Sequence, residues 1–146
     1  FIWKKSIEII KDNPIFGVGQ GNFETAYATF LDSSKNETNK RSHAHNDFLN
    51  FGAVAGIPGA LLFILIWCVV LFRLHQIWHK SEAFSERKIF AGAAAVAGLM
   101  FILESLTECT FADEEVRQLL MVVWSAGLWP MMANSSEIGV GNNESA

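Results

Sequence analysis

The chain has 146 residues, enough for one domain, of which 51% are apolar and only 18% charged. Its net charge of −4 excludes the strongly basic balance of nucleic-acid-binding proteins. Cys68 lies inside one apolar run and Cys109 near the end of another, so we expect free thiols rather than a disulfide. The sequence starts at Phe1 with no targeting segment, and we expect a fragment whose active site is partly outside it.

Residues 1–52 predict an extramembrane region that begins with an amphipathic helix. Apolar side chains recur at helical spacing on one face, and most charges lie elsewhere. The helix should end at the Asp-Asn-Pro segment, residues 12–14, because the residue before a proline avoids the helical conformation. The apolar face consists of Trp3, Ile7 and Ile10.

A glycine-rich turn and a second short helix follow. The turn, GVGQG at residues 17–21, lacks the full spacing and the strand–helix frame of a dinucleotide-binding loop, so we reject that function. Asn22 is expected to cap the second helix, and residues 33–42 to form a loop. The apolar residues of this helix that share a face are Phe23, Tyr27, Phe30 and Leu31.

Three apolar runs predict membrane-spanning helices. Residues 53–72 contain no charge, and at 1.5 Å per residue they cross a hydrocarbon core of about 30 Å. A buried core helix of a soluble protein is the alternative, but such helices are usually shorter. The run at 89–106 is interrupted only by Glu104 and is rich in Ala and Gly, which favours close helix packing. The third run, 118–133, is uncharged.

The segments between these runs suggest an orientation. Residues 73–88 hold four Lys and Arg, which favours the cytoplasmic side and puts residues 1–52 and the acidic connector 107–117 at the periplasmic face. An equal number of basic residues on the other side leaves the charge rule tied. The polar tail 134–146 is predicted to be disordered. The expected fold is therefore all-α, with amphipathic periplasmic helices followed by three transmembrane helices.

Three segments resemble the O-antigen ligase family. The first is His45-Asn46 shortly before Gly56-Ile57-Pro58-Gly59, at the start of the first apolar run. The second is the upstream pattern with Trp3 and the stretch IIKDNPIFGVGQGNF at residues 9–23. The third is Leu106-Thr107-Glu108 with the acidic connector. They occur in the order of the family and together cover nearly the whole chain.

The resemblance implies a multi-pass inner-membrane enzyme of the GT-C-like kind. Such enzymes take a glycan from an undecaprenyl-diphosphate carrier and pass it to the lipid A core. Related members act as O-antigen polymerases or as protein O-oligosaccharyltransferases. The reaction is taken to be inverting and to need no metal or cofactor. The family's essential histidine corresponds to His45, and the resemblance extends to the adjacent Asn46 but not to the arginines that hold the diphosphate.

The residues themselves agree with this chemistry. Glycosyl transfer needs a base for the acceptor hydroxyl and cations for the leaving diphosphate. An imidazole such as His45 accepts a proton near neutral pH, Asn46 could orient it or the sugar, and Lys40 and Arg41 could contact phosphate oxygens. The plain alternatives are an interfacial histidine at the helix start and a solvated basic loop.

Two further features are less specific. His43, His45 and Asp47 alternate as metal ligands can, but no fuller ligand set follows, so we expect no metal. Glu104 is an ionisable group within a membrane run, with Glu108 one helical turn later. A non-enzymatic membrane protein, such as a transporter subunit, remains an alternative function.

Overall fold

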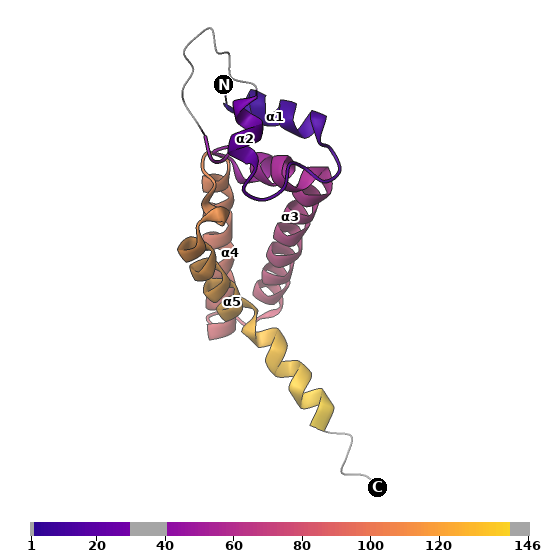
Figure 1. Cartoon of the computed structure of the whole chain (residues 1–146). Coiled ribbons are helices and arrows are strands. Elements are labelled where there is room, and N and C mark those ends of the chain that lie inside the picture. The colour runs from indigo at the N-terminus through magenta and orange to yellow at the C-terminus, as the bar shows by residue number, and fades with distance from the viewer. Residues whose placement is uncertain (1, 30–40, 141–146) are drawn as a thin grey trace. The chain divides into compact units, whose positions relative to one another are not determined.

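A computed structural model describes residues 2–29 and 41–140, with residues 130–140 described by their backbone alone. All regular structure within these ranges is helical, as predicted (Figure 1). The helices are α1 (Ile2–Asp12), α2 (Phe23–Ala28), α3 (Asp47–Lys80), α4 (Glu86–Ser105), the short 3-10 helix η2 (Thr110–Ala112) and α5 (Glu114–Val140).

The chain divides into two compact units. The first consists of Phe1–Trp67 and Phe101–Glu114, and the second of Cys68–Met100 and Glu115–Ala146. The first unit therefore brings the start of α3 together with the end of α4 and the connector that follows it. All residues of the candidate site described below belong to this first unit.

Helix α3 is kinked near its start. Gly56 has φ 74° and ψ −177°, a backbone conformation that is essentially restricted to glycine. A Cβ atom at this position would lie 2.3 Å from the carbonyl oxygen of Ile15. Pro58 follows within the helix and has no N–H to donate to the carbonyl of Val54. The kink therefore leaves backbone groups of α3 available to another segment.

Residues 14–19 occupy this kink. The carbonyl oxygen of Val54 accepts a hydrogen bond from the backbone N–H of Gly19 at 2.9 Å, in place of the missing proline N–H. Two further backbone bonds complete the contact, from Val18 N to Ala53 O and from Ile57 N to Pro14 O, each at 2.8 Å. Two motifs that are separate in the sequence thus form a single packed unit.

The core of the first unit lies beneath α1 and α2. It consists of Ile9, Phe23, Tyr27, Ala44 and Ala53. The predicted apolar face of α1 is displaced around the helix, since Ser6 and Ile9 are buried. Trp3 and Ile7 stay 45% and 43% exposed, whereas Ile10, the third residue of the predicted face, packs against this core.

The residue predicted to cap helix α2 does not use its side chain for that purpose. Asn22 occupies the N-cap position, but its side chain makes no cap hydrogen bond. Its amide instead donates to the carbonyl of Val18 at 2.9 Å, which stabilises the glycine-rich turn. The predicted face of this helix is buried at Phe23 and Tyr27, while Phe30 and Leu31 lie outside the described residues.

Two helices of the described chain, α3 and α4, are long and apolar enough to cross a membrane. They correspond to the predicted spans 53–72 and 89–106, although α3 is longer than its span at both ends. Only 17% of the apolar window of α3 is buried, so most of its apolar side chains face outward, as they do in lipid. Helix α5 covers the predicted third span and continues beyond it; that it crosses the membrane stays a prediction.

Small residues bring helices close together within the second unit. Ala91 and Ala94 of α4 are buried, with exposed fractions of 0% and 1%. A Cβ atom placed on Gly127 of α5 would lie 2.5 Å from the Cβ atom of Ala94. The Ala- and Gly-rich character of α4 thus serves close contact with a neighbouring helix.

Candidate functional site

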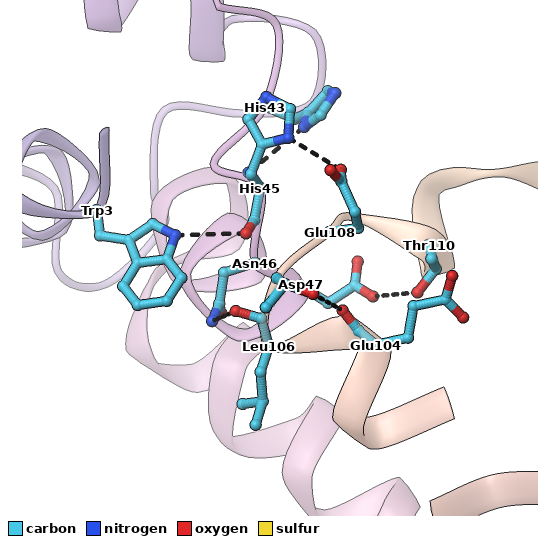
Figure 2. Close-up of polar contacts among 10 residues, drawn as sticks. Trp3, His43, His45, Asn46, Asp47, Glu104, Leu106, Glu108 and Thr110 are labelled. Carbon is cyan, nitrogen blue, oxygen red and sulfur yellow. Dashed lines mark hydrogen bonds and ion pairs between the residues drawn. The ribbon is translucent and has the colours of Figure 1, made fainter. Parts of the chain in front are cut away.

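The loop before α3 places two histidines side by side. The rings of His43 and His45 lie 4.3 Å apart between centroids. His45 has φ 51°, in the left-handed region that is uncommon for residues other than glycine and in which asparagine, aspartate and histidine are the most frequent of these. The indole N–H of Trp3 donates to the carbonyl of His45 at 3.3 Å, so α1 helps to fix this residue (Figure 2).

His45 contacts a carboxylate that lies 63 positions away in the sequence. Its Nδ1 lies 2.9 Å from Oε2 of Glu108, which stands in the connector after α4. The hydrogen bond from His45 is the main reason that the pKa of Glu108 lies below its ordinary value of 4.5. Because a carboxylate only accepts hydrogen bonds, Nδ1 carries the proton and Nε2 of a neutral His45 is left as the acceptor.

His43 is held in its neutral form. Partial burial of the ring, and then the charge of His45, lower the pKa of His43 below its ordinary value of 6.5. Its Nδ1 faces the backbone N–H of His45 at 3.4 Å. His43 therefore adds an uncharged neighbour rather than a second cation.

Asn46 joins the start of α3 to the connector. Its side-chain amide donates to the carbonyl of Leu106 at 2.9 Å, and its side-chain oxygen accepts the N–H of Leu49 at 2.9 Å. The second bond caps α3, as an N-cap residue does. These contacts are structural, and a contact of Asn46 with substrate stays a prediction.

Asp47 is fully buried against the end of α4. Its Oδ2 accepts hydrogen bonds from Ser105 Oγ at 2.8 Å, Thr110 Oγ1 at 3.3 Å and the backbone N–H of Phe111 at 3.0 Å. Its relative exposure is 0%. Cys109 lies buried in the same connector, and burial raises the pKa of this thiol to about 11.

The structure brings together a different set of possible metal ligands from the set considered in the sequence. His43, His45 and Glu108 each offer a ligand atom, and these atoms lie within 4.8 Å of one another. Asp47, the carboxylate considered from the sequence, points instead to Ser105 and the connector. Glu108 was not foreseen as a third donor, because it lies 63 positions after His45. In the structure, His45 Nδ1 and Glu108 Oε2 contact each other directly at 2.9 Å.

The remaining predicted residues lie at the edge of the site. Arg41 is exposed in the loop before His43, close enough for its charge to lower the pKa of His43 slightly. Lys40 lies outside the described residues. Glu104 is exposed near the end of α4, and because that helix ends at Ser105, Glu108 lies in the connector rather than on a continued helical face.

Sequence reasoning missed the partnership between His45 and Glu108. The two residues are 63 positions apart, and no periodic pattern links them. The one available signal was the resemblance of both the His-Asn segment and the Leu-Thr-Glu segment to the same family. In the structure these two segments are in contact, through the hydrogen bond from Asn46 to Leu106.

Comparison with known proteins supports the resemblance. A search among curated proteins found no match. The model of a family described as O-Antigen ligase matches residues 1–64, which include α1, α2, the loop with His45 and the kinked start of α3. The predicted resemblance is thereby confirmed over residues 1–64, which are similar to the O-antigen ligase family, whereas the Leu106-Thr107-Glu108 segment lies outside the matched range.

Proposed function

We propose that this protein is a membrane glycosyltransferase that moves a glycan from an undecaprenyl-diphosphate carrier to the lipid A core, with His45 as the general base. The family match supports a glycosyltransferase-like activity on lipid-linked glycans. The observation that carries the proposal is the 2.9 Å contact between His45 Nδ1 and Glu108, because it gives the imidazole a defined orientation within the matched segment.

The proposed step is a single displacement. Nε2 of His45 takes the proton from an acceptor hydroxyl while that oxygen forms a bond to the anomeric carbon of the glycan. The bond from this carbon to the diphosphate oxygen breaks, and the undecaprenyl diphosphate leaves with the electron pair. Glu108 accepts the hydrogen bond from Nδ1 and stabilises the imidazolium that forms. The carbon is inverted once.

The position of the pair suits substrates from two phases. His45 lies just before α3, one of the two helices long and apolar enough to cross a membrane. A base at the end of such a helix meets a lipid-borne donor and a water-side acceptor together. We place this end at the periplasmic face of the inner membrane, in keeping with the basic segment 73–88, which covers the other end of α3, the loop after it and the start of α4.

Cationic residues are proposed to bind the donor. Arg41 is exposed in the same loop as His45, and Lys40 precedes it. A guanidinium binds two phosphate oxygens at once, whereas an ammonium acts as a point charge. In this assignment Arg41 and Lys40 offset part of the charge that develops on the leaving diphosphate.

A deletion strain complemented with variants tests the proposal. His45→Asn keeps a residue that tolerates the left-handed backbone but has no base, and His75→Asn is the matched control on an exposed face of α3. We expect His45→Asn to give unattached long glycan chains and uncapped lipid A core, with His75→Asn normal. Normal capping with His45→Asn would contradict the proposal.

The same strain separates the possible acceptors. The assignment to the lipid A core rests on the family description O-Antigen ligase. Caps of a single repeat unit in the His45→Asn strain would replace it with a polymerase. Loss of glycan from protein, with normal lipopolysaccharide, would replace it with a protein O-oligosaccharyltransferase.

A further inference from the structure

Asp47 has more partners than a helix-capping carboxylate needs. It is the second residue after His45, and its relative exposure is 0%. All three of its hydrogen-bond donors come from residues 105–111, at distances of 2.8 to 3.3 Å. All three donors bond to Oδ2, while Oδ1 is buried without a hydrogen-bond partner among the described residues. The bonds therefore offset only part of the desolvation cost, and burial keeps the pKa of Asp47 above its ordinary value of 3.8. These three hydrogen bonds hold the Asp47 carboxylate in one orientation relative to residues 105–111.

The donors lie on both sides of Glu108 along the chain. Ser105 precedes it, and Thr110 and Phe111 follow it. Figure 2 shows Thr110 bonded to Asp47 beside Glu108. The amide of Asn46 adds a bond to the carbonyl of Leu106 at 2.9 Å. The connector is thus held before and after the residue whose carboxylate contacts His45.

We propose that Asp47 is a positioning residue, which holds the connector so that the Glu108 carboxylate stays against Nδ1 of His45. This inference rests on the proposed function of His45. Asp47 itself is buried and does not touch substrate. It acts through Glu108, and its neighbours in sequence, His45 and Asn46, are fixed by the same set of bonds.

The first test needs no enzymatic activity. Cys109 lies inside the segment that Asp47 holds, and it is 8% exposed with a pKa raised to about 11, so its thiol should react slowly. In full-length protein in membranes with Cys68→Ala, we expect Asp47→Ala to raise the labelling rate of Cys109 by about tenfold or more with a hydrophilic maleimide. Glu82→Ala, in the loop after α3, is the control and should leave the rate unchanged.

Two conservative variants guard against general unfolding. Asp47→Asn keeps an acceptor oxygen but loses the charge, and Ser105→Ala removes one donor and leaves the carboxylate in place. Both should raise Cys109 labelling less than Asp47→Ala does, while protein amounts in the membrane stay normal. The charge of Asp47 itself raises the pKa of Cys109, so Ser105→Ala, which keeps that charge, is the deciding variant. Labelling of Cys109 at the original rate in Ser105→Ala would overturn the inference, whatever the activity.

The second test asks whether Asp47 acts through Glu108. With the lipid-linked glycan as donor, we expect Asp47→Asn and Glu108→Gln each to lower kcat by about 100-fold with little change in KM. The double variant should be no slower than Glu108→Gln alone, because the second change removes an effect already lost. If the losses in kcat of the two single variants multiply in the double variant, Asp47 has a merely structural role.

The tests separate the two proposals. If Cys109 becomes reactive in Asp47→Ala but Glu108→Gln and His45→Asn transfer glycan at the original rate, the positioning of the connector stands and the proposed chemistry fails. If Glu108→Gln is slow and Asp47→Asn is as fast as the unaltered protein, the chemistry stands and the role of Asp47 fails.

Discussion

His45 adopts a backbone conformation that costs a residue with a Cβ atom about 1–2 kcal/mol. The surrounding contacts hold it there, with Trp3 bonded to its carbonyl and Asn46 and Asp47 bonded to the connector. Strain of this kind is retained where function needs a side chain in one direction. In His45, this backbone conformation turns Nδ1 of the side chain toward Glu108.

The neutral state of His43 predicts a pH dependence of stability. Its pKa is lowered in the folded protein, chiefly by burial, so the unfolded chain binds more protons as the pH falls below 6.5. Stability from this group is therefore complete above pH 6.5 and is lost on acidification. We expect the Tm of the purified protein to fall between about pH 7 and pH 5.5, and to fall less in His43→Gln.

Glu108 provides a check on that assignment. Its pKa is depressed from 4.5, so its contribution is lost only at a lower pH than that of His43. Glu108→Gln should keep the fall of Tm in the window above and make it slightly steeper, because the charge of Glu108 raises the pKa of His43. Equal slopes for His43→Gln and the unaltered protein would show that His43 is not the titrating group.

Sequence reasoning at this scale pointed to His45 as a candidate base but not to Glu108 as its partner. The motif around His45 is local, because a histidine, an asparagine and the start of an apolar run are close along the chain. Glu108 and the role of Asp47 depend on contacts across 58 to 64 positions, and single-sequence patterns carry no information on such pairs.

At the scale of the helices, the kink in α3 predicts a strong effect for one methyl group. Gly56→Ala should destabilise the protein by roughly 2–5 kcal/mol, the sum of backbone strain and overpacking, because the new Cβ atom meets the carbonyl of Ile15 at 2.3 Å. Gly21→Ala is the matched control, with φ 81° but no atom within 4 Å, and should cost only the strain.

Thermal unfolding in detergent measures the difference between these variants. Gly56→Ala should also expose the segment 14–19 to proteolysis, because the backbone bonds at the kink are lost. Equal destabilisation by both variants would mean that the contact between Gly56 and Ile15 does not restrict the fold.

Helix boundaries were the least predictable elements. The hydropathy pattern starts the first span at residue 53, but α3 begins at Asp47, since Asn46 caps it and Oδ2 of Asp47 accepts hydrogen bonds from residues 105–111. Hydropathy scores a buried, hydrogen-bonded aspartate as a polar interruption. The end of α1 was predicted correctly, because Pro14 acts locally.

For the whole molecule, the apolar surfaces of α3 and α4 predict burial in lipid. Cys68 is exposed on α3, yet it lies within a span of mean hydropathy 2.6. In membranes with Cys109→Ala, we expect a hydrophilic maleimide to label Cys68 at least about 100-fold more slowly than a His79→Cys variant at the end of the helix, because a thiolate is disfavoured in hydrocarbon.

The side of the membrane from which the His79→Cys variant is labelled tests the topology. A reagent confined to the cytoplasmic side should label His79→Cys, and one confined to the periplasm should not. Rapid labelling of Cys68 in intact membranes would contradict the assignment of α3 as a span. The composition pointed to a membrane protein from the start, whereas the number of spans and their orientation depend on α5 and on a balanced charge count.

The most direct measurement of the central claim is the rate of glycan transfer by purified protein in a single turnover, with lipid-linked glycan bound beforehand. If the His45 imidazole takes the acceptor proton, His45→Asn lowers this rate by about 100- to 10,000-fold without weakening donor binding, and His75→Asn leaves it unchanged. A His45→Asn rate equal to that of the unaltered protein would contradict the account.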